Sequence, residues 1–479
     1  MDTLEVYRGW LKGGLGGMKI VIERFGPIKR FEYNLEKDMI VTYGDNNIGK
    51  SYAMQIVYLV LKTFISNSYI TPRMYRQIYF YPQGMENSKS KERVENLLTL
   101  FIQSDDDVLD ITQYIIDEVN TLITMTYMDE FMNSCRNTFG NLEKTLEKDP
   151  QIEIEYKEYK FDFDLKGNKV TGHINMKPVR LKKTTSDFHK SRNSKNHLDI
   201  YVVEKMDSPE SIIFEQIQKN FILFVRRISA DFENVYFLPA SRSGIYAGMN
   251  AFGSIVAELS KNRARFTKKI EFPGISEPIS DYFIALSSIK ARTNESLGNY
   301  YGHIENKILK GKVTFDKTKN ALMYRPNNVD ALYEMTEVSS MVSEVSPIVA
   351  FLKYIMETGY KKNKFAKSVL FIEEPEAHLH PNNQIALVDV FSKLINENVK
   401  LIMSSHSNYV FNKLNNLVLA KKLDYSSYDP IVLEETQEGS ISKHIEVDEL
   451  GANDENFIDV SEALYNEREE IIENLNMEE

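Results

Sequence analysis

Residues 39–51 read Met39-Ile40-Val41-Thr42-Tyr43-Gly44-Asp45-Asn46-Asn47-Ile48-Gly49-Lys50-Ser51. The first five residues predict a buried strand, and the apolar residues after Ser51 predict a helix to about Leu61. A glycine-rich loop between such a strand and helix is typical of phosphate binding, because its amides and the helix N-terminus face negative charge. Lys50 is placed to reach terminal phosphates, and the Ser51 hydroxyl to ligate Mg²⁺. We therefore predict that residues 44–51 bind a nucleotide.

A second apolar run lies far downstream and ends in two carboxylates. Residues 369–375 read Val369-Leu370-Phe371-Ile372-Glu373-Glu374-Pro375. A phosphate-binding loop needs one carboxylate at the end of a neighbouring strand for the metal, and another to orient attacking water. We assign Glu373 to the metal and Glu374 to catalysis. Because alternate residues of a strand face opposite sides, the strand end could exchange these roles.

Three histidines follow these carboxylates in the sequence. His406 comes directly after residues 399–405, another short apolar run, so we expect its imidazole beside the same phosphates as a second catalytic group. His378 and His380 suggest a metal site, but no further ligand cluster accompanies them. For these two we favour a packed turn after the acid pair.

This set of motifs resembles the ABC-type ATPases of the branch that RecF proteins, SMC proteins and the overcoming-lysogenisation-defect ATPases share. The resemblance implies ATP and Mg²⁺ as cofactors, ATP hydrolysis as the activity, and a nucleotide contact from Arg24. The stretches that carry it are Met18-Lys19-Ile20-Val21-Ile22-Glu23-Arg24-Phe25-Gly26-Pro27-Ile28, Val235-Tyr236-Phe237-Leu238-Pro239-Ala240-Ser241-Arg242, Glu337-Val338-Ser339-Ser340-Met341-Val342-Ser343-Glu344-Val345-Ser346-Pro347 and Glu373-Glu374-Pro375-Glu376-Ala377-His378-Leu379-His380-Pro381.

The third of these stretches is similar to the family's signature loop. The resemblance implies that Ser339 and Ser340 bind the phosphate of a nucleotide held by another subunit, which requires head-to-tail ATP sandwiches and an oligomer of at least two chains. Met341 stands where transporters commonly have glycine. An ordinary serine-rich turn is the alternative. Ser346 and Pro347 predict the N-cap and first residue of a helix that runs to about Met356.

Lys50 and Glu374 are too far apart in the sequence for one strand-helix-strand step, so we expect a large insertion within a single core. The expected fold is α/β, an ABC-type P-loop NTPase core with an antiparallel β arm and a largely helical insertion. The expected segments are 18–85 (first part of the core), 86–233 (helical and β-hairpin insertion), 234–455 (second part of the core) and 456–479 (acidic helix).

Patterns within these segments predict individual elements. Residues 88–146 combine charge with periodic apolar positions and predict long helices. From Gln151 the apolar residues alternate, and residues 166–169 predict the turn of a β-hairpin. Residues 417–420 predict a last core strand and residues 430–447 two edge strands, which leaves no expected room for a C-terminal Toprim nuclease domain. Residues 1–17 are expected to be a loose extension, since Met18 opens a pattern typical of a natural start.

Composition limits the kinds of partner and the cellular compartment that we expect for this chain. A net charge of -11 disfavours diffuse binding of nucleic acid over the whole surface. The basic runs 177–195 and 261–269 are either solvated loops or local sites for nucleic acid or an acidic protein. The single cysteine, Cys135, fits a reducing cytoplasm. No apolar run reaches the roughly 18 to 20 residues that a membrane span needs. We therefore expect a cytoplasmic protein without membrane contact.

The motif set further resembles the stand-alone ATPases of bacterial anti-phage defence, the AriA type of PARIS and the PtuA type of Septu. This resemblance implies a sensor or scaffold subunit whose ATP-bound oligomer controls a separately encoded effector, expected to be a nuclease, in response to a phage-derived trigger. The alternative is a RecF-like DNA-repair or chromosome-maintenance ATPase that binds DNA directly. A transporter subunit is less well supported, because Glu373 stands where aspartate is usual. A nuclease is less well supported because no metal-ligand set lies outside the nucleotide motifs.

Overall fold

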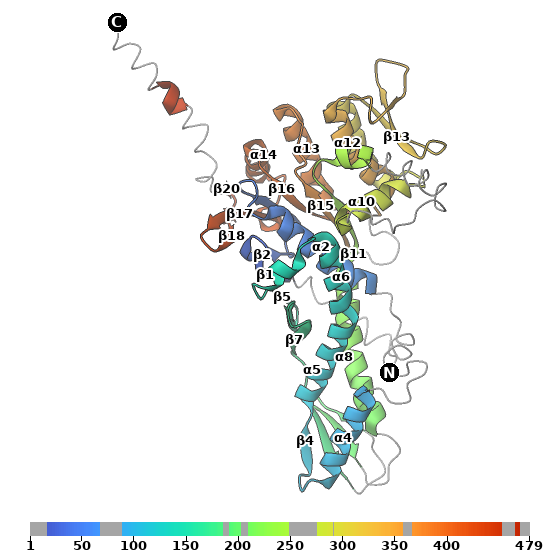
Figure 1. The fold of residues 1–479 in the computed structure, drawn as a ribbon, viewed down its shortest axis with the longest axis vertical. Coiled ribbons are helices and arrows are strands. Elements are labelled where there is room, and N and C mark those ends of the chain that lie inside the picture. Colours follow the sequence, from blue (N-terminus) through green and yellow to red (C-terminus); the bar gives the residue numbers. More distant parts are fainter. Residues whose placement is uncertain are drawn as a thin grey trace, which may run out of the picture.

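The computed structural model describes residues 17–67, 89–184, 191–202, 209–248, 275–290, 292–357, 366–452 and 465–469. The described chain is built around one large sheet (Figure 1). Its strands are β1 (Met18–Phe25), β2 (Ile28–Asn34), β3 (Met39–Tyr43), β5 (Gln151–Tyr156), β6 (Tyr159–Asp164), β7 (Lys169–Ile174), β11 (Phe232–Leu238), β15 (Lys367–Glu373), β16 (Val399–Ser405), β17 (Tyr428–Thr436) and β18 (Gly439–His444). They lie in the order β11-β15-β16-β3-β17-β18-β2-β1-β5-β6-β7.

The five strands from β11 to β17 are parallel to one another. Strands buried on both faces read as continuous apolar runs, which is why residues 39–43 and 369–372 show no alternation. The register pairs Glu373 with Ser404, and Ser404 with Thr42. Because parallel strands all end at the same edge, the segments that follow β3, β15 and β16 meet there.

The rest of the large sheet is mostly antiparallel. β1 pairs with β2 and β5, and β5, β6 and β7 form a meander whose second turn is the one predicted at residues 166–169. A third strand therefore extends the expected hairpin. Alternate residues of β6 are buried, including Phe161 and Phe163. This arm continues the parallel core, and together they confirm the expected α/β fold with an antiparallel β arm.

Helices cover both faces of the parallel strands, with Ile40 facing one hydrophobic cluster and its neighbours Met39 and Val41 facing the other. The cluster around Ile40 includes the apolar face of α2, and the opposite cluster includes α12, α13 and α14. The helices near the sheet are α2 (Lys50–Asn67), α10 (Glu277–Ser287), α11 (Gly298–His303), α12 (Ser340–Ala350), α13 (Pro381–Leu394) and α14 (Asn408–Leu419), with π or 3-10 turns at Glu295–Leu297, Ile304–Leu309, Phe351–Ile355, Ile395–Glu397 and Tyr425–Ser427.

A stalk of helices projects from the sheet and ends in a second, four-stranded sheet (Figure 1). Its elements are α4 (Lys89–Gln103), β4 (Val108–Asp110), α5 (Thr112–Ile123), a π turn (Thr124–Met128), α6 (Asp129–Thr138), β8 (Val179–Lys183), β9 (Ser191–Asn193), β10 (Leu198–Val202) and α8 (Pro209–Asp231). The short helix α7 (Leu142–Leu146) contacts β1 of the large sheet. The prediction of helices over residues 88–146 is confirmed, with interruptions. Smaller sheets are formed by β12 (Gly311–Asp316), β13 (Ala321–Pro326) and β14 (Tyr333–Glu334), and by β19 (Val447–Asp448) and β20 (Gly451–Ala452).

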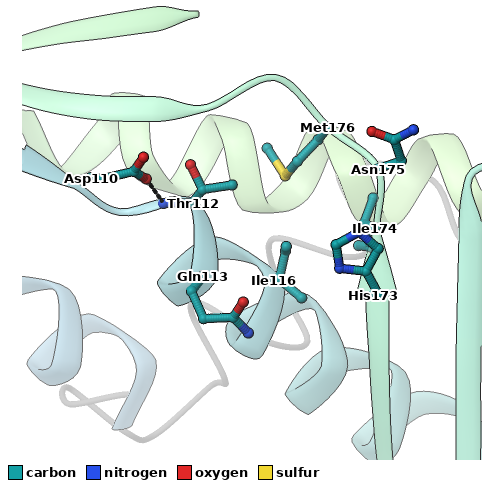
Figure 2. A pocket seen from close by; sticks show the side chains of 8 residues that line it. All are labelled: Asp110, Thr112, Gln113, Ile116, His173, Ile174, Asn175 and Met176. Atoms are coloured by element: carbon teal, nitrogen blue, oxygen red, sulfur yellow. Dashed lines mark hydrogen bonds between the residues drawn. The ribbon is translucent and has the colours of Figure 1, made fainter.

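A cavity of about 460 Å³ lies between the start of α5 and the end of β7 (Figure 2). It is lined by Asp110, Thr112, Gln113, Ile116, His173, Ile174, Asn175 and Met176. The Asp110 carboxylate accepts a hydrogen bond of 2.8 Å from the amide of Thr112, the first residue of α5. No residue of the stretch 39–51 lines this cavity.

Three local predictions were wrong. Residues 417–420 are not a strand, because Leu414, Leu417 and Val418 are buried at helical spacing at the end of α14. Residues 430–447 contain strands, but β17 and β18 are inner strands that separate β3 from β2. The helix predicted to begin at Pro347 begins at Ser340 instead.

The early start of α12 has a physical cause. Val342, Val345 and Ile348 form a buried apolar stripe that continues through Pro347. The Ser346 hydroxyl donates to the Val342 carbonyl at 2.7 Å within the helix rather than capping a new one. The stabilisation from burying this stripe therefore exceeds the cost of the helical hydrogen bond that is lost at Pro347.

The basic run 177–195 is partly neutralised within the stalk. Arg180 and Lys182 both form ion pairs of 2.8 Å with the buried Asp199. The Lys183 ammonium donates to the Ser104 carbonyl. These contacts favour a structural role for three of its cations. The run 261–269 lies outside the described residues, as does most of the C-terminal segment, of which residues 465–469 are helical.

No helix within the described ranges is both long enough and apolar enough to span a membrane.

A pH-dependent contact joins β17 and β18. His444 Nδ1 lies 2.8 Å from Asp429 Oδ1, and this hydrogen bond raises the pKa of His444 above its usual value of about 6.5. A raised folded-state pKa stabilises the protein fully below the unfolded-state pKa, and the contribution is lost as pH rises through the folded-state value.

We therefore expect the free energy of unfolding of the unmodified chain to exceed that of His444→Gln at pH 6, with the difference shrinking towards pH 8. Urea unfolding across this range measures it. The matched control is His173→Gln at an exposed position on β7, which should follow the unmodified chain at every pH. A difference that grows with pH would contradict the assignment.

Candidate nucleotide-binding site

The loop between β3 and α2 has the backbone of a phosphate cradle. Gly44, Asn47 and Gly49 have φ angles of 138°, 65° and 106°. A Cβ at Gly44 would lie 2.6 Å from Ile48 Cδ1 and 2.8 Å from the Leu433 carbonyl oxygen, so only glycine fits there. The loop leads directly into the N-terminus of α2, whose free amides attract anions.

Lys50 follows this loop as the first residue of α2 and is 6% exposed. Its ammonium donates to the carbonyl oxygens of Gly44 at 2.8 Å and Asp45 at 2.6 Å. Burial lowers its pKa, while the charges of Glu374, Asp45 and Glu376 oppose that shift. The nearby carboxylates therefore help to keep the buried ammonium charged.

Glu373, at the end of β15, is 5% exposed. Its Oε2 accepts a hydrogen bond of 3.1 Å from the Ala240 amide, whereas its buried Oε1 has no hydrogen-bond partner among the described residues. Burial raises the pKa of Glu373, and the Ala240 amide and the Ser51 hydroxyl lower it. A buried carboxylate oxygen without a partner beside a serine hydroxyl fits the oxygen ligands that Mg²⁺ prefers.

Glu374 differs from its neighbour in backbone and environment. Its φ of 43° is a left-handed conformation, and its amide donates to the Ser404 carbonyl at 3.1 Å. Its Oε1 lies 3.6 Å from Nε2 of His406, and both side chains are partly exposed. His406 lowers the pKa of Glu374, with a smaller contribution from Lys50 in the same direction. Glu374 therefore presents an ionised carboxylate near the loop.

Glu376 belongs to this site, although we did not predict it as a site residue. Its Oε1 accepts hydrogen bonds from the Ser405 hydroxyl at 2.6 Å and the His406 amide at 2.8 Å. Its Oε2 is buried without a hydrogen-bond partner within the described part of the chain. Glu376 thus holds the segment that carries His406 against β15. Its place in the Glu-Glu-Pro-Glu run was the signal that could have identified it.

Arg242 is the second residue of this site that we did not predict from the sequence. Its side chain is completely buried, and its guanidinium donates to the backbone carbonyls of Glu373 at 2.7 Å and Glu374 at 3.2 Å. The same group donates to the Glu344 carbonyl of α12 at 3.1 Å. The Pro-Ala-Ser-Arg run marked this segment, but the sequence did not indicate that the arginine binds the carboxylate strand.

Arg24 makes its polar contacts with residues outside the loop. Its Nε donates to the Asp149 carbonyl at 3.0 Å, and its Nη1 lies 3.3 Å from a Glu23 carboxylate oxygen. The turn that follows it does contact the nucleotide-binding segment, since a Cβ at Gly26 would lie 2.8 Å from the Tyr52 ring of α2. This turn therefore buttresses the start of α2.

Ser339 and Ser340 stand apart from the loop, at the exposed N-terminus of α12. Ser339 is the N-cap residue, but its hydroxyl makes no capping hydrogen bond. Within the described ranges neither hydroxyl binds a residue of the phosphate-binding loop. The two serines are free to contact a group from outside the chain.

His378 and His380 lie in the turn between β15 and α13. His380 is the N-cap of α13, and its Nδ1 accepts from the Asn382 amide at 3.4 Å. His378 is exposed, with a φ of 62°. No group of three or more metal-ligating side chains occurs in the part of the chain that the structure describes. The contact of His380 supports a structural role for this histidine in the turn before α13.

Comparison with known proteins identifies a family that matches most of the chain. Residues 18–411 match the AAA ATPase domain family. No curated protein matches the chain.

Similar solved structures include three SMC heads. One is an SmcHead bound to the C-winged helix domain of ScpA, with 11% identity, a TM-score of 0.35, and coverage of 90% of this chain and 98% of the other. The SMC head domain from Thermotoga maritima has 10% identity, a TM-score of 0.33, and coverage of 90% and 100%. An Smc head with an extended coiled coil, bound to a ScpA domain derived from Pyrococcus furiosus, has 10% identity, a TM-score of 0.35, and coverage of 90% and 96%.

The family match spans most of the chain and contains the phosphate-binding loop, both glutamates and His406. The chain therefore belongs to the AAA ATPase domain family.

Proposed function

We propose that this chain binds ATP with Mg²⁺ at residues 44–51 and hydrolyses it, using the carboxylates of Glu373 and Glu374 at the end of β15. The observation that carries the proposal is the contrast between two adjacent glutamates. Glu373 is buried with a free oxygen beside Ser51, while Glu374 is accessible and lies 3.6 Å from His406. In this proposal segments 18–85 and 234–455 form one ATPase core, 86–233 is its insertion, and 456–479 is a closing or docking helix.

The loop residues bind the phosphates. Amides from 44–49 and the N-terminus of α2 surround them, and Lys50 exchanges its bonds to the Gly44 and Asp45 carbonyls for phosphate oxygens. Ser51 Oγ and Glu373 Oε1 would hold Mg²⁺, which when bound neutralises charge on the phosphates. Without such a cation, the free oxygen of Glu373 remains a buried acceptor that lacks a donor.

Glu374 accepts a proton from the attacking water. The water oxygen forms a bond to the terminal phosphorus, the bond from that phosphorus to the bridging oxygen breaks, and ADP leaves. The lowered pKa of Glu374 keeps the carboxylate ionised for this step. His406, which Glu376 holds in place, donates a hydrogen bond to the terminal phosphate.

We expect Glu374→Gln to lower kcat by at least about 100-fold, because the amide cannot accept the proton, and to change the ATP dissociation constant by less than about twofold. Phosphate release and fluorescent ATP titration measure the two quantities. Glu434→Gln, at an exposed position on β17, is the matched control and should keep full turnover.

Glu373→Gln should behave differently, with ATP affinity reduced in Mg²⁺ but unchanged in excess EDTA. If Glu373→Gln instead lost turnover with intact Mg²⁺-dependent affinity, the two glutamates would have exchanged roles.

Lys50→Ala should weaken ATP binding at least tenfold, about 1.4 kcal/mol, because the loop loses its buried cation. Isothermal titration with a non-hydrolysable ATP analogue measures this loss. Lys29→Ala removes a partly exposed lysine of β2, which pairs with Glu438, and should leave affinity unchanged. Equal affinities for all three proteins would place the nucleotide elsewhere.

We further propose that ATP assembles at least two copies of the chain. The support is the position of Ser339 and Ser340, which are exposed at the N-terminus of α12 and do not contact the loop of their own chain. A helix N-terminus with free hydroxyls is suited to a phosphate presented by a facing protomer. Each site would then combine the loop of one copy with the signature serines of another.

With Glu374→Gln as the background, Mg²⁺-ATP should shift the chain to a dimer or larger assembly in size-exclusion chromatography with light scattering. Adding Ser339→Glu should abolish this shift, because a carboxylate repels the partner's phosphate. Ser288→Glu, at an exposed position after α10, is the control and should still assemble. Assembly that persists with Ser339→Glu would refute the sandwich.

The biological role that we propose is a sensor or scaffold subunit of a bacterial anti-phage defence complex. Support comes from the resemblance of the motif set to the ATPases AriA of PARIS and PtuA of Septu. In such a complex the ATP-bound oligomer restrains a separately encoded nuclease until a phage-derived trigger alters the assembly.

Co-expression with the adjacent gene should yield a complex that depends on an intact phosphate-binding loop. Salt-sensitive, ATP-dependent DNA binding by the chain alone would instead favour a RecF-like repair ATPase. The single carboxylate of Asp199 offsets part of the charge of Arg180 and Lys182, which weakens that alternative for these two residues.

A further inference from the structure

Arg242 connects three separate segments at the carboxylate end of the sheet. Besides the carbonyls of Glu373 and Glu374, its guanidinium donates to the Pro239 carbonyl at 3.1 Å, which fixes the turn after β11. Its side chain is completely buried. A buried guanidinium is stable only when its donors are matched, and here backbone carbonyls supply most of the acceptors.

The bonds to Glu373 and Glu374 have a specific geometric effect. The two carbonyls belong to the peptide units on either side of the Glu374 Cα, so holding both restrains φ and ψ of Glu374 together. Glu374 has the left-handed φ of 43°, which is unfavourable for a residue with a Cβ. Arg242 thus stabilises a backbone conformation that sets the direction of the Glu374 carboxylate.

The third connection reaches α12 through Glu344, which is 1% exposed. Glu344 Oε2 lies 3.4 Å from Arg242 Nε, and the Glu344 carbonyl accepts from the same Nε at 3.1 Å. Glu344 Oε1 accepts from the Ser243 amide at 3.1 Å and the Ser243 hydroxyl at 2.5 Å. The position of α12 is therefore tied to the residues that flank Arg242.

We propose that Arg242 is a positioning residue that aims the Glu374 carboxylate and couples its aim to α12 through Glu344. Ser339 and Ser340 stand at the N-terminus of this helix, so contact with a second copy of the chain is transmitted to Glu374 within the same chain. This inference rests on the proposed ATPase function and adds to it a route by which assembly regulates hydrolysis.

The first test compares Arg242→Lys with Arg325→Lys, a matched change at an exposed position on β13. Lysine keeps the charge but cannot reach the three segments with a planar fork of donors. Arg242→Lys should lower kcat at least tenfold while changing the ATP dissociation constant less than twofold. Arg325→Lys should change none of these quantities.

A second test separates positioning from general stability. In the Glu374→Gln background, adding Arg242→Lys should reduce the residual turnover no further, because the carboxylate that it aims is already absent. A further tenfold loss in that background would overturn the positioning role.

Glu344→Gln is a milder change that tests the coupling to α12 if Arg242→Lys does not fold. It keeps the shape of the side chain and removes the ion pair with Arg242. If assembly regulates hydrolysis, the turnover of the unmodified chain depends on protein concentration. In Glu344→Gln, turnover should fall at least threefold and lose this dependence, while ATP binding is retained. Unchanged, concentration-dependent turnover would overturn the coupling. Absence of turnover in the unmodified chain would instead refute the proposed ATPase function.

Discussion

Parallel pairing of β15, β16 and β3 is the constraint on which the rest of the structure depends. It ends three strands at one edge, in a register that pairs Glu373 with Ser404 and Ser404 with Thr42. The phosphate-binding loop, the two glutamates and His406 follow these strands, so hydrogen bonding of the sheet alone brings them together. The antiparallel arm and the stalk extend from this arrangement (Figure 1).

Burial and neighbouring charges together set the pKa values of the ionisable side chains at this edge of the sheet. Lys50 loses solvation inside the loop, and Glu374, Asp45 and Glu376 offset the effect on its pKa. Glu373 loses solvation as well, but it keeps a carboxylate oxygen without a donor. The difference between the two glutamates arises because one side chain enters the sheet edge while the left-handed backbone turns the next towards His406.

Sequence reasoning succeeded where a short pattern determines a local structure. Residues 39–51 specify a strand, a loop and a helix, and the apolar residues at 369–372 specify a buried strand. It failed where packing against distant segments decides between alternatives. Pro347 is a favourable first helical residue, but the buried stripe that includes Val345 and Ile348 extends α12 through it. Residues 430–447 were expected to be edge strands, and only the pairing of β17 with β3 and of β18 with β2 makes them inner strands.

The sequence by itself determined the chemistry at this site: the phosphate-binding loop, the two carboxylates and the histidine. These features are local, because each depends on a few adjacent side chains at the end of one strand. Only the tertiary structure decided that Arg242 binds the backbone of Glu373 and Glu374, and that Glu376 holds the segment of His406. Such contacts join residues far apart in the chain, and no local pattern specifies which buried carbonyl a guanidinium will reach.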